Sequence, residues 1–318
     1  MLGSTARRAK GIDMDIDYEV LVIGGGAAGL AAAVALARSR RSVLVIDAGE
    51  PRNAPADGVH NVLTREGTPP MELLKLGREE LRGYGGEVRE ARAASMLRED
   101  DRFVVTLGDA GRVSARRVVV TTGLVDELPD VAGLRQRWGH DVLHCPYCHG
   151  WEVRDRAIGV LASSPMSVHQ ALLFRQLSDD VTFLVNGCGL DDEARWQLDR
   201  AGIALVEGTV SAVEVEDDAI CGVRLAGDRV VAVEAVVVTP RMVARSEVLA
   251  SLGAETREHP MGNGVQVVVD EMGRTTVPGV YAAGNLVDIS AQVMGAAAAG
   301  TRVGAAVNID LIMSDLRA

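Results

Sequence analysis

The stretch YEVLVIGGGAAGLAAAVALARSRRSVLVIDAGEPRN, residues 18–53, follows the order strand, glycine loop, helix, strand. Its residues 19–23, EVLVI, are apolar and mostly β-branched after the first residue, as in buried parallel strands. Gly24, Gly26 and Gly29 follow with the spacing G-x-G-x-x-G. A helix of small residues is predicted over 30–39, and the next strand is predicted over 42–47. The stretch therefore predicts an α/β dinucleotide-binding unit.

Each feature of this unit has a physical role. Gly24 permits a tight turn, Gly26 lets a pyrophosphate approach the backbone, and Gly29 lets the helix pack closely on the strand. The helix N-terminus then faces the phosphates. Asp47, 23 residues after Gly24, is placed to bond ribose hydroxyls. A glycine-rich turn without a ligand is the alternative, but the complete order of elements favours a dinucleotide site.

Length and charge narrow the remaining possibilities. A chain of 318 residues suits two domains. The net charge of -11 argues against a nucleic-acid or anionic-membrane surface. No apolar run reaches the roughly 18 residues of a membrane span, and no secretion signal is visible near the start. We expect residues 1–15 to be disordered and the protein to be cytoplasmic.

Two further glycine-bearing segments extend the pattern. Residues 118–123, VVVTTG, predict a strand ending at Gly123, and residues 279–284, GVYAAG, predict a strand followed by Asn285 and a helix over 292–312. With these segments the chain resembles the flavoprotein disulfide reductases that have two dinucleotide domains, and most of all the small thioredoxin reductases. The resemblance implies an α/β fold with two Rossmann-like three-layer domains. It implies a discontinuous FAD domain, residues 16–127 plus 245–318, and a central domain, residues 128–244.

The same resemblance implies FAD as the cofactor. In that family a late acidic residue contacts the ribityl chain of FAD, and Asn285 takes its position here. An amide can still accept and donate a hydrogen bond. The residues that we expect to bind FAD are Gly24, Gly26, Ala27, Ala28, Gly29, Asp47, Ala48, Arg52, Asn53, His60, Asn61, Thr122, Gly123, Gly284, Asn285, Gln292 and Val293.

The central domain lacks the features by which these reductases bind NADPH. Strands are predicted over 157–162, 181–185, 202–208, 212–217, 222–226 and 235–240. The family's G-G-G-N-S-A segment aligns with Ala162, Ser163 and Ser164, so every glycine is replaced. Its arginine-rich H-R-R-x-x-x-R segment, which holds the 2′-phosphate, also has no counterpart, because no arginine follows the second strand until Arg195. We expect this domain to keep the fold and to bind NADPH poorly or not at all.

The stretch HCPYCHGWE, residues 144–152, contains the cysteine pair Cys145 and Cys148. Zinc usually needs four ligands, and no second C-x-x-C pair exists, so no metal site is predicted. A purely structural disulfide is disfavoured in a cytoplasmic protein. The flavoprotein resemblance favours a redox-active dithiol/disulfide.

The resemblance also implies roles for these residues. In the thioredoxin reductases the pattern is C-x-x-C-D-G, so Cys148 is expected to face the flavin and Cys145 to exchange with substrate. His149 replaces the proton-shuttling acid. Histidine titrates near neutral pH and can remove a proton from a dithiol, and as imidazolium it would favour a thiolate. A base at this position suits dithiol oxidation, and His144 is a second catalytic candidate.

The run CPYCHGWE resembles one branch of the family, the FAD-dependent dithiol oxidases that close disulfides in natural products of the gliotoxin and holomycin type. GEPRN, residues 49–53, and His60-Asn61 also recur there. The branch implies a homodimer that oxidises a small-molecule dithiol and passes the electrons to dioxygen. Two alternatives stay open at this point: a thioredoxin or related disulfide reductase fed by NADPH, ferredoxin or flavodoxin, and a flavin-bound redox sensor without turnover.

Overall fold

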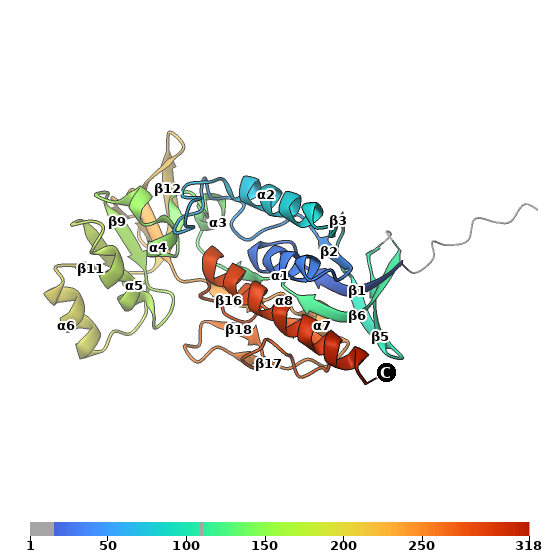
Figure 1. The fold of residues 1–318 in the computed structure, drawn as a ribbon. Helices are drawn as coiled ribbons and strands as arrows, with labels where there is room; N and C mark the ends of the chain where they lie inside the picture. Colours follow the sequence, from blue (N-terminus) through green and yellow to red (C-terminus); the bar gives the residue numbers. More distant parts are fainter. Residues whose placement is uncertain (1–15, 109–110, 318) are drawn as a thin grey trace, which may run out of the picture.

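The structure is a computed structural model that describes residues 16–108 and 111–317. The disorder predicted for residues 1–15 lies outside this range. Two α/β units lie side by side (Figure 1). The first is built from the two ends of the chain and the second from its middle, and they are joined by two neighbouring strands.

The first unit contains a seven-stranded sheet with the order β3-β2-β1-β6-β5-β4, in which β19 also pairs with β6. The strands β1, β2, β3, β6 and β19 are parallel, and β4 and β5 are antiparallel to their neighbours. Its strands are β1 (Ile16–Ile23), β2 (Val43–Asp47), β3 (Glu87–Glu90), β4 (Ser95–Glu99), β5 (Arg102–Thr106), β6 (Arg112–Val120) and β19 (Val280–Ala282).

Side chains alternate between the two faces of this sheet, and each face has its own core. Val20, Val22, Val43 and Val45 pack against three helices, whereas residues such as Leu21 face the opposite side. The three helices are α1 (Ala27–Arg38), α2 (Pro70–Gly83) and α8 (Val293–Asp315). Helix α1 begins directly after the glycine loop that follows β1, and α8 begins shortly after β19 and packs on α1. The N-termini of both helices therefore lie at the carboxyl ends of the parallel strands (Figure 1).

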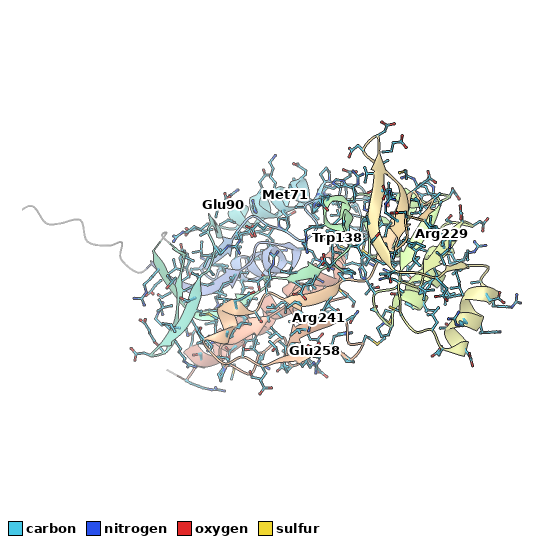
Figure 2. All side chains as sticks on the ribbon, turned by 180° about the vertical axis from the view of Figure 1, so that it is seen from behind. Met71, Glu90, Trp138, Arg229, Arg241 and Glu258 are labelled. Atoms are coloured by element: carbon cyan, nitrogen blue, oxygen red, sulfur yellow. A yellow bond between two sulfur atoms is a disulfide. The ribbon has the colours of Figure 1, made fainter. Side chains whose placement is uncertain are left out.

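A four-stranded sheet with the order β17-β18-β16-β7 joins the units. The chain leaves the first unit through β7 and returns through β16. Within this sheet, Arg241 on β16 donates to Glu258 on β17 at 2.7 Å (Figure 2). The elements here are β7 (Leu124–Glu127), β16 (Arg241–Ala244), β17 (Thr256–Glu258), β18 (Gly264–Val267), α7 (Glu247–Ala250) and η3 (Gly284–Leu286). The domain boundaries expected from the sequence stay predictions.

The central unit has a parallel sheet with the order β11-β10-β9-β15-β8, covered on one side by helices and on the other by the antiparallel sheet β12-β13-β14. Its strands are β8 (Val142–Leu143), β9 (Ile158–Leu161), β10 (Val181–Leu184), β11 (Ala204–Val206), β12 (Val210–Glu216), β13 (Ala219–Leu225), β14 (Val230–Val231) and β15 (Ala235–Val238). Its helices are α3 (Leu134–Arg137), α4 (Pro146–His149), η2 (Trp151–Val153), α5 (Ser167–Phe174) and α6 (Asp192–Arg200).

This architecture confirms the predicted fold class of two Rossmann-like three-layer units. The helix predicted over 30–39 and the strand predicted over 42–47 are α1 and β2. The helix predicted over 292–312 is α8, which continues to Asp315. Within the two described ranges, none of the helices combines the length and the apolarity needed to cross a membrane.

Candidate active site

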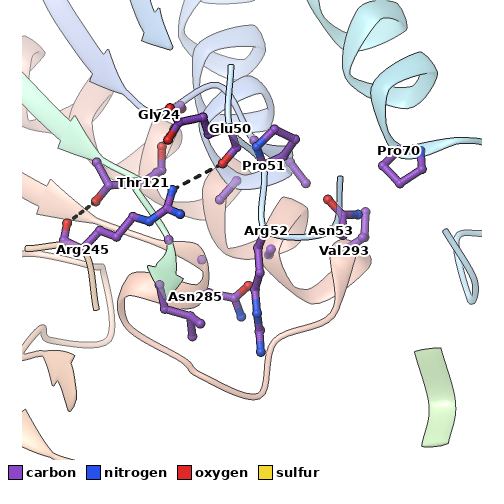
Figure 3. A pocket seen from close by; sticks show the side chains of 18 of the residues that line it. Gly24, Glu50, Pro51, Arg52, Asn53, Pro70, Thr121, Arg245, Asn285 and Val293 are labelled. Carbon is purple, nitrogen blue, oxygen red and sulfur yellow. Dashed lines mark hydrogen bonds between the residues drawn. The ribbon is translucent and has the colours of Figure 1, made fainter. Parts of the chain in front are cut away.

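One cavity of about 830 Å³ lies where the two units meet, at the carboxyl ends of the parallel strands. Residues after β1, β2, β6 and β19 line one part of it, and the cysteine pair lines another. Figure 3 shows part of the lining that the first unit contributes. The predicted residues that line the cavity are Gly24, Gly26, Ala27, Ala28, Asp47, Ala48, Arg52, Asn53, His60, Thr122, Gly123, His144, Cys145, Cys148, His149, Gly284, Asn285, Gln292 and Val293.

The glycine loop has the geometry that its spacing predicts. Gly24 has a φ of +106°, and a Cβ there would lie 2.5 Å from the carbonyl oxygen of Thr121. Gly29 does not line the cavity, because it packs inside the unit, where a Cβ would lie 1.9 Å from the Gly24 carbonyl oxygen. Gly26 differs from both, since a Cβ there would meet no protein atom within 4 Å. The open space beside Gly26 fits a pyrophosphate at the start of α1.

Asp47 lies beside this loop with both carboxylate oxygens engaged. The Gly25 N–H donates to Oδ1 at 3.1 Å, and Nη2 of Arg78 donates to Oδ2 at 2.5 Å. Each oxygen keeps a further lone pair for a ribose hydroxyl. Arg78 itself does not line the cavity. The free acceptor capacity of Asp47 and the open space beside Gly26 fit FAD.

The opposite wall of the cavity is formed around Asn285 and the start of α8. Asn285 Nδ2 donates to the carbonyl oxygens of Asp288 at 3.0 Å and Ala291 at 2.9 Å. Its Oδ1 is the remaining acceptor and could receive a ribityl hydroxyl. Asn285, which replaces the family's acid, therefore stabilises the loop between η3 and α8 through these two hydrogen bonds. Gln292, the N-cap of α8, adds a second helix N-terminus to the cavity.

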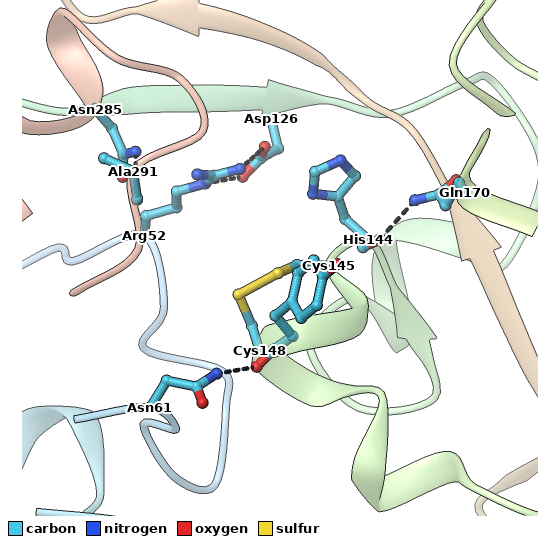
Figure 4. Close-up of a disulfide and its surroundings, with 10 residues drawn as sticks. Arg52, Asn61, Asp126, His144, Cys145, Cys148, Gln170, Asn285 and Ala291 are labelled. Carbon is cyan, nitrogen blue, oxygen red and sulfur yellow. Dashed lines mark hydrogen bonds and ion pairs between the residues drawn. A yellow bond between two sulfur atoms is a disulfide. The ribbon is translucent and has the colours of Figure 1, made fainter. Parts of the chain in front are cut away.

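Three predicted cofactor contacts are engaged with protein groups. Nε and Nη2 of Arg52 donate to the Asp126 carboxylate, both at 2.7 Å (Figure 4). His60 Nδ1 lies 2.7 Å from Glu66, and its Nε2 lies 3.4 Å from Glu152 in the central unit. Asn61 does not line the cavity, since its Nδ2 donates to the carbonyl oxygen of Tyr147 at 2.6 Å.

The cysteine pair forms a disulfide whose Cα atoms lie 5.2 Å apart. Cys145 precedes the short helix α4, and Cys148 lies within it, so both sulfur atoms are held by one turn at the cavity wall. Cys188 and Cys221 are free and exposed. In the part of the chain that the structure describes, no group of three or more His, Cys, Asp or Glu side chains is placed to hold a metal ion.

Both catalytic histidine candidates line the same cavity in partly buried positions. Burial lowers the pKa of His149 from its ordinary value of 6.5, while Glu152 opposes the shift. Burial and the Arg52 guanidinium lower the pKa of His144 to about 4. At neutral pH both imidazoles are therefore mainly uncharged, which suits a proton acceptor and weakens the imidazolium role considered for His149.

The loop after β9, which the resemblance aligns with the family's nucleotide-binding segment, has its amide groups engaged by serine side chains. The N–H groups of Ser163 and Ser164 donate to Ser167 Oγ at 3.1 and 3.2 Å. Ser163 Oγ donates to the Thr239 carbonyl oxygen at 2.9 Å. Because it accepts from both amides, the hydroxyl of Ser167 occupies the position at which they would donate to a phosphate. Ser167 is 1% exposed.

Sequence reasoning missed several residues that shape the site. Arg245 joins the cavity wall by donating to the Glu50 carbonyl oxygen at 3.3 Å (Figure 3), and its own carbonyl oxygen accepts from Thr122 Oγ1 at 2.6 Å. Arg78, which donates to Asp47, and Gln170, which donates to the His144 carbonyl oxygen, are two further residues that were not predicted. The 14-residue helix α2 carries Arg78 within an ordinary amphipathic pattern, so no local signal distinguished it.

The fold and the cavity define a protein of two Rossmann-like units with a cysteine pair at the cavity between them. The chain belongs to the pyridine nucleotide-disulphide oxidoreductase family, whose profile matches residues 18–300. Membership in this family implies FAD binding. The chain is therefore a flavin-dependent thiol–disulfide oxidoreductase of the thioredoxin-reductase-like type, and the resemblance found in the sequence is confirmed.

Individual relatives agree with this assignment. Thioredoxin reductase sirT of Leptosphaeria maculans is 31% identical over 95% of this chain and 96% of that protein. Thioredoxin reductase tcpT of Claviceps purpurea is 34% identical over 53% of this chain and 56% of its own length, so the match covers about half of that relative. The crystal structure of HlmI is 46% identical, with a TM-score of 0.88 over 95% of this chain and 94% of HlmI.

Proposed function

We propose that this protein oxidises a small-molecule dithiol to an intramolecular disulfide, with dioxygen as the final electron acceptor and hydrogen peroxide as the second product. The observation that carries the proposal is the shared cavity, which the Cys145–Cys148 disulfide and His149 line together with most of the residues expected to bind FAD. The C-x-x-C-H-G pattern supports the same direction of electron flow through its resemblance to natural-product dithiol oxidases.

The chemistry of the cysteine pair follows from thiol–disulfide exchange. A substrate thiolate attacks Cys145 Sγ, the bond to Cys148 breaks, and Cys148 leaves as a thiolate. The second substrate thiol loses its proton and attacks the mixed disulfide, which releases the product disulfide and Cys145. The two substrate electrons then reside on the cysteine pair. When bound in the cavity beside the pair, FAD would supply the two-electron acceptor and the route to dioxygen.

His149 is suited to accept the protons that the two substrate thiols release. It follows Cys148 directly and lines the same cavity. A positioned base contributes about 10²–10⁴-fold to such a transfer. Its lowered pKa keeps the imidazole able to accept a proton at neutral pH.

We propose that NADPH has no role in this cycle. The amides of Ser163 and Ser164 are engaged by Ser167, and Ser163 and Ser164 carry side chains where relatives have glycine. A pyrophosphate would have to displace Ser167 and approach a backbone shielded by these side chains.

The relatives' names favour a second candidate, a reductase that works in the opposite direction on thioredoxin or a related disulfide. Oxygen uptake separates the two functions. We expect fast uptake with small dithiols and no NADPH, with one hydrogen peroxide formed per dithiol consumed, and loss of uptake in Cys145→Ser and Cys148→Ser. Uptake that requires NADPH would support the reductase, and no turnover with any partner would support a redox sensor.

We also propose that the protein works as a cytoplasmic homodimer, on the strength of its resemblance to the thioredoxin reductases. Gel filtration with light scattering would test the oligomeric state.

A further inference from the structure

The cysteine segment, residues 144–149, has every backbone carbonyl of its first four residues engaged. The Cys145 carbonyl oxygen accepts from the N–H groups of Cys148 and His149, both at 3.2 Å, and the Pro146 oxygen accepts from Gly150 at 3.0 Å. These bonds belong to the local helical turn. The His144 carbonyl instead receives the side-chain amide of Gln170 (Figure 4), and the Tyr147 carbonyl receives that of Asn61.

Gln170 holds the start of the segment from within the central unit. Its Nε2 donates to the His144 carbonyl oxygen at 2.6 Å, and its Oε1 accepts from Thr239 Oγ1 at 3.0 Å. Gln170 and Thr239 are each 4% exposed, so the amide is fixed in orientation and shielded from water. Thr239 is in turn bonded to Ser163, which connects the closed nucleotide loop with the residue before Cys145.

Asn61 holds the end of the segment from the other unit. Its Nδ2 donates to the Tyr147 carbonyl oxygen at 2.6 Å, across a separation of 86 residues in sequence. The loop that carries it is stiffened by bonds from Val59 N–H to the Thr68 carbonyl oxygen and from Asn61 N–H to Glu66. Asn61 has a φ of +57°, a conformation that asparagine and aspartate tolerate better than most residues.

We propose that Asn61 and Gln170 form an amide clamp that keeps the cysteine segment beside the flavin site throughout turnover, so that the central unit does not swing away between steps. The proposal rests on the proposed function, in which no nicotinamide has to reach the flavin. It assigns Asn61 a positioning role across the two units in place of the cofactor contact expected from the sequence. His60, 3.4 Å from Glu152, adds a second contact across the same boundary.

The first test of the clamp is a scattering experiment whose result does not depend on the proposed function. Small-angle X-ray scattering of the holoprotein is recorded in the oxidised state and after reduction with dithionite. The clamp predicts superimposable profiles for wild type in both states and a changed profile in the double variant Asn61→Gly/Gln170→Met. A wild-type profile that changes on reduction, or a double variant that matches wild type in both states, would overturn the clamp whether or not the protein oxidises dithiols.

Kinetics then test positioning. Asn61→Asp keeps the shape and the left-handed backbone but cannot donate, Asn61→Gly removes the amide without adding charge, and Gln170→Met keeps the length without polar atoms. We expect each to lower kcat for dithiol oxidation about tenfold, as for loss of a hydrogen bond of about 1.4 kcal/mol, with KM within about twofold. Asn186→Asp, which alters an amide of the central unit outside the clamp, is the control and should keep the wild-type kcat.

The outcomes separate the competing roles. Loss of bound flavin in both Asn61 variants would restore the cofactor contact and overturn the clamp. An unchanged kcat in Asn61→Gly and Gln170→Met would also overturn it. A wild-type protein that fails to oxidise any dithiol, while its scattering stays unchanged on reduction, would contradict the proposed function and leave the clamp supported.

Discussion

His149 is the residue at which this chain departs most clearly from the C-x-x-C-D-G pattern of its family. Partial burial at the cavity wall disfavours its charged form and lowers its pKa. The residue can therefore accept a thiol proton at neutral pH, whereas a protonated acid in its place would donate one. This lowered pKa therefore supports the proposed direction of electron flow, from a dithiol to the flavin.

Replacing His149 with alanine should lower dithiol oxidation about 100-fold near neutral pH, because the thiol protons lose their acceptor. The sign of the pH dependence follows from the lowered pKa. The wild-type rate should fall as the pH drops below 6.5 and through that pKa, because imidazolium cannot accept a proton. The ratio of wild-type to variant rates should shrink there. Steady-state kcat across a pH series measures this.

His169→Ala is a matched control for this series, since His169 is an exposed histidine of the same unit. It should leave the pH profile unchanged. If the rate of His149→Ala equalled that of wild type across pH 6–9, the proton-accepting role would be wrong.

Asn285 offers a second test at this scale. Asn285→Asp restores the acid of the wider family, yet it should weaken FAD binding about tenfold, because a carboxylate cannot donate to the Asp288 and Ala291 carbonyls. Fluorescence titration of the apoprotein with FAD measures the affinity. Asn308→Asp is the control, because Asn308 accepts from Arg41 and an aspartate can do the same. Tighter FAD binding in Asn285→Asp would contradict this account.

At the scale of single residues, the sequence could predict those that act together with close neighbours along the chain. The glycine spacing and the cysteine pair are legible because each acts within a few neighbours along the chain. Asn61 was predicted as a cofactor neighbour, but its hydrogen bond to Tyr147 joins residues 86 apart. Nothing in local spacing signals such a contact, and the same holds for Arg78 and Asp47.

At the scale of elements, the turn from β9 into α5 is the most informative. The family resemblance implies a nucleotide-binding turn here, but Ser167 Oγ accepts from two loop amides at the start of α5. The sequence itself shows that the glycines of the family pattern are replaced. It could not predict that a serine three or four residues further on would engage the amides, because that depends on the conformation of the loop.

Ser167→Ala should destabilise the protein by about 1–3 kcal/mol, since it leaves two amides of a partly buried loop without their acceptor. Urea unfolding should show a lower midpoint with an unchanged m-value. Ser211→Ala, which removes a hydroxyl bonded to a carbonyl at the surface, is the control and should change stability by less than about 0.5 kcal/mol. Equal stability of Ser167→Ala and wild type would show that the serine does not close the loop.

For the whole molecule, the fold class was predictable because buried parallel strands and small-residue helices carry strong periodic signals. Both units and the family were recognised on that basis. The linking sheet was not, since β7 and β16 are short strands whose pairing depends on the relative placement of two units. The position of the disulfide in the FAD cavity is also a property of the whole molecule, because it requires both units together.

The central claim is that electrons enter this flavoprotein from a dithiol through Cys145 and Cys148. The most direct measurement is anaerobic stopped-flow absorbance of the holoprotein mixed with a small dithiol or with NADPH. We predict rapid bleaching of the flavin by the dithiol, none in Cys145→Ser, and none with micromolar NADPH. Rapid bleaching by micromolar NADPH, with no response to dithiols, would contradict the account.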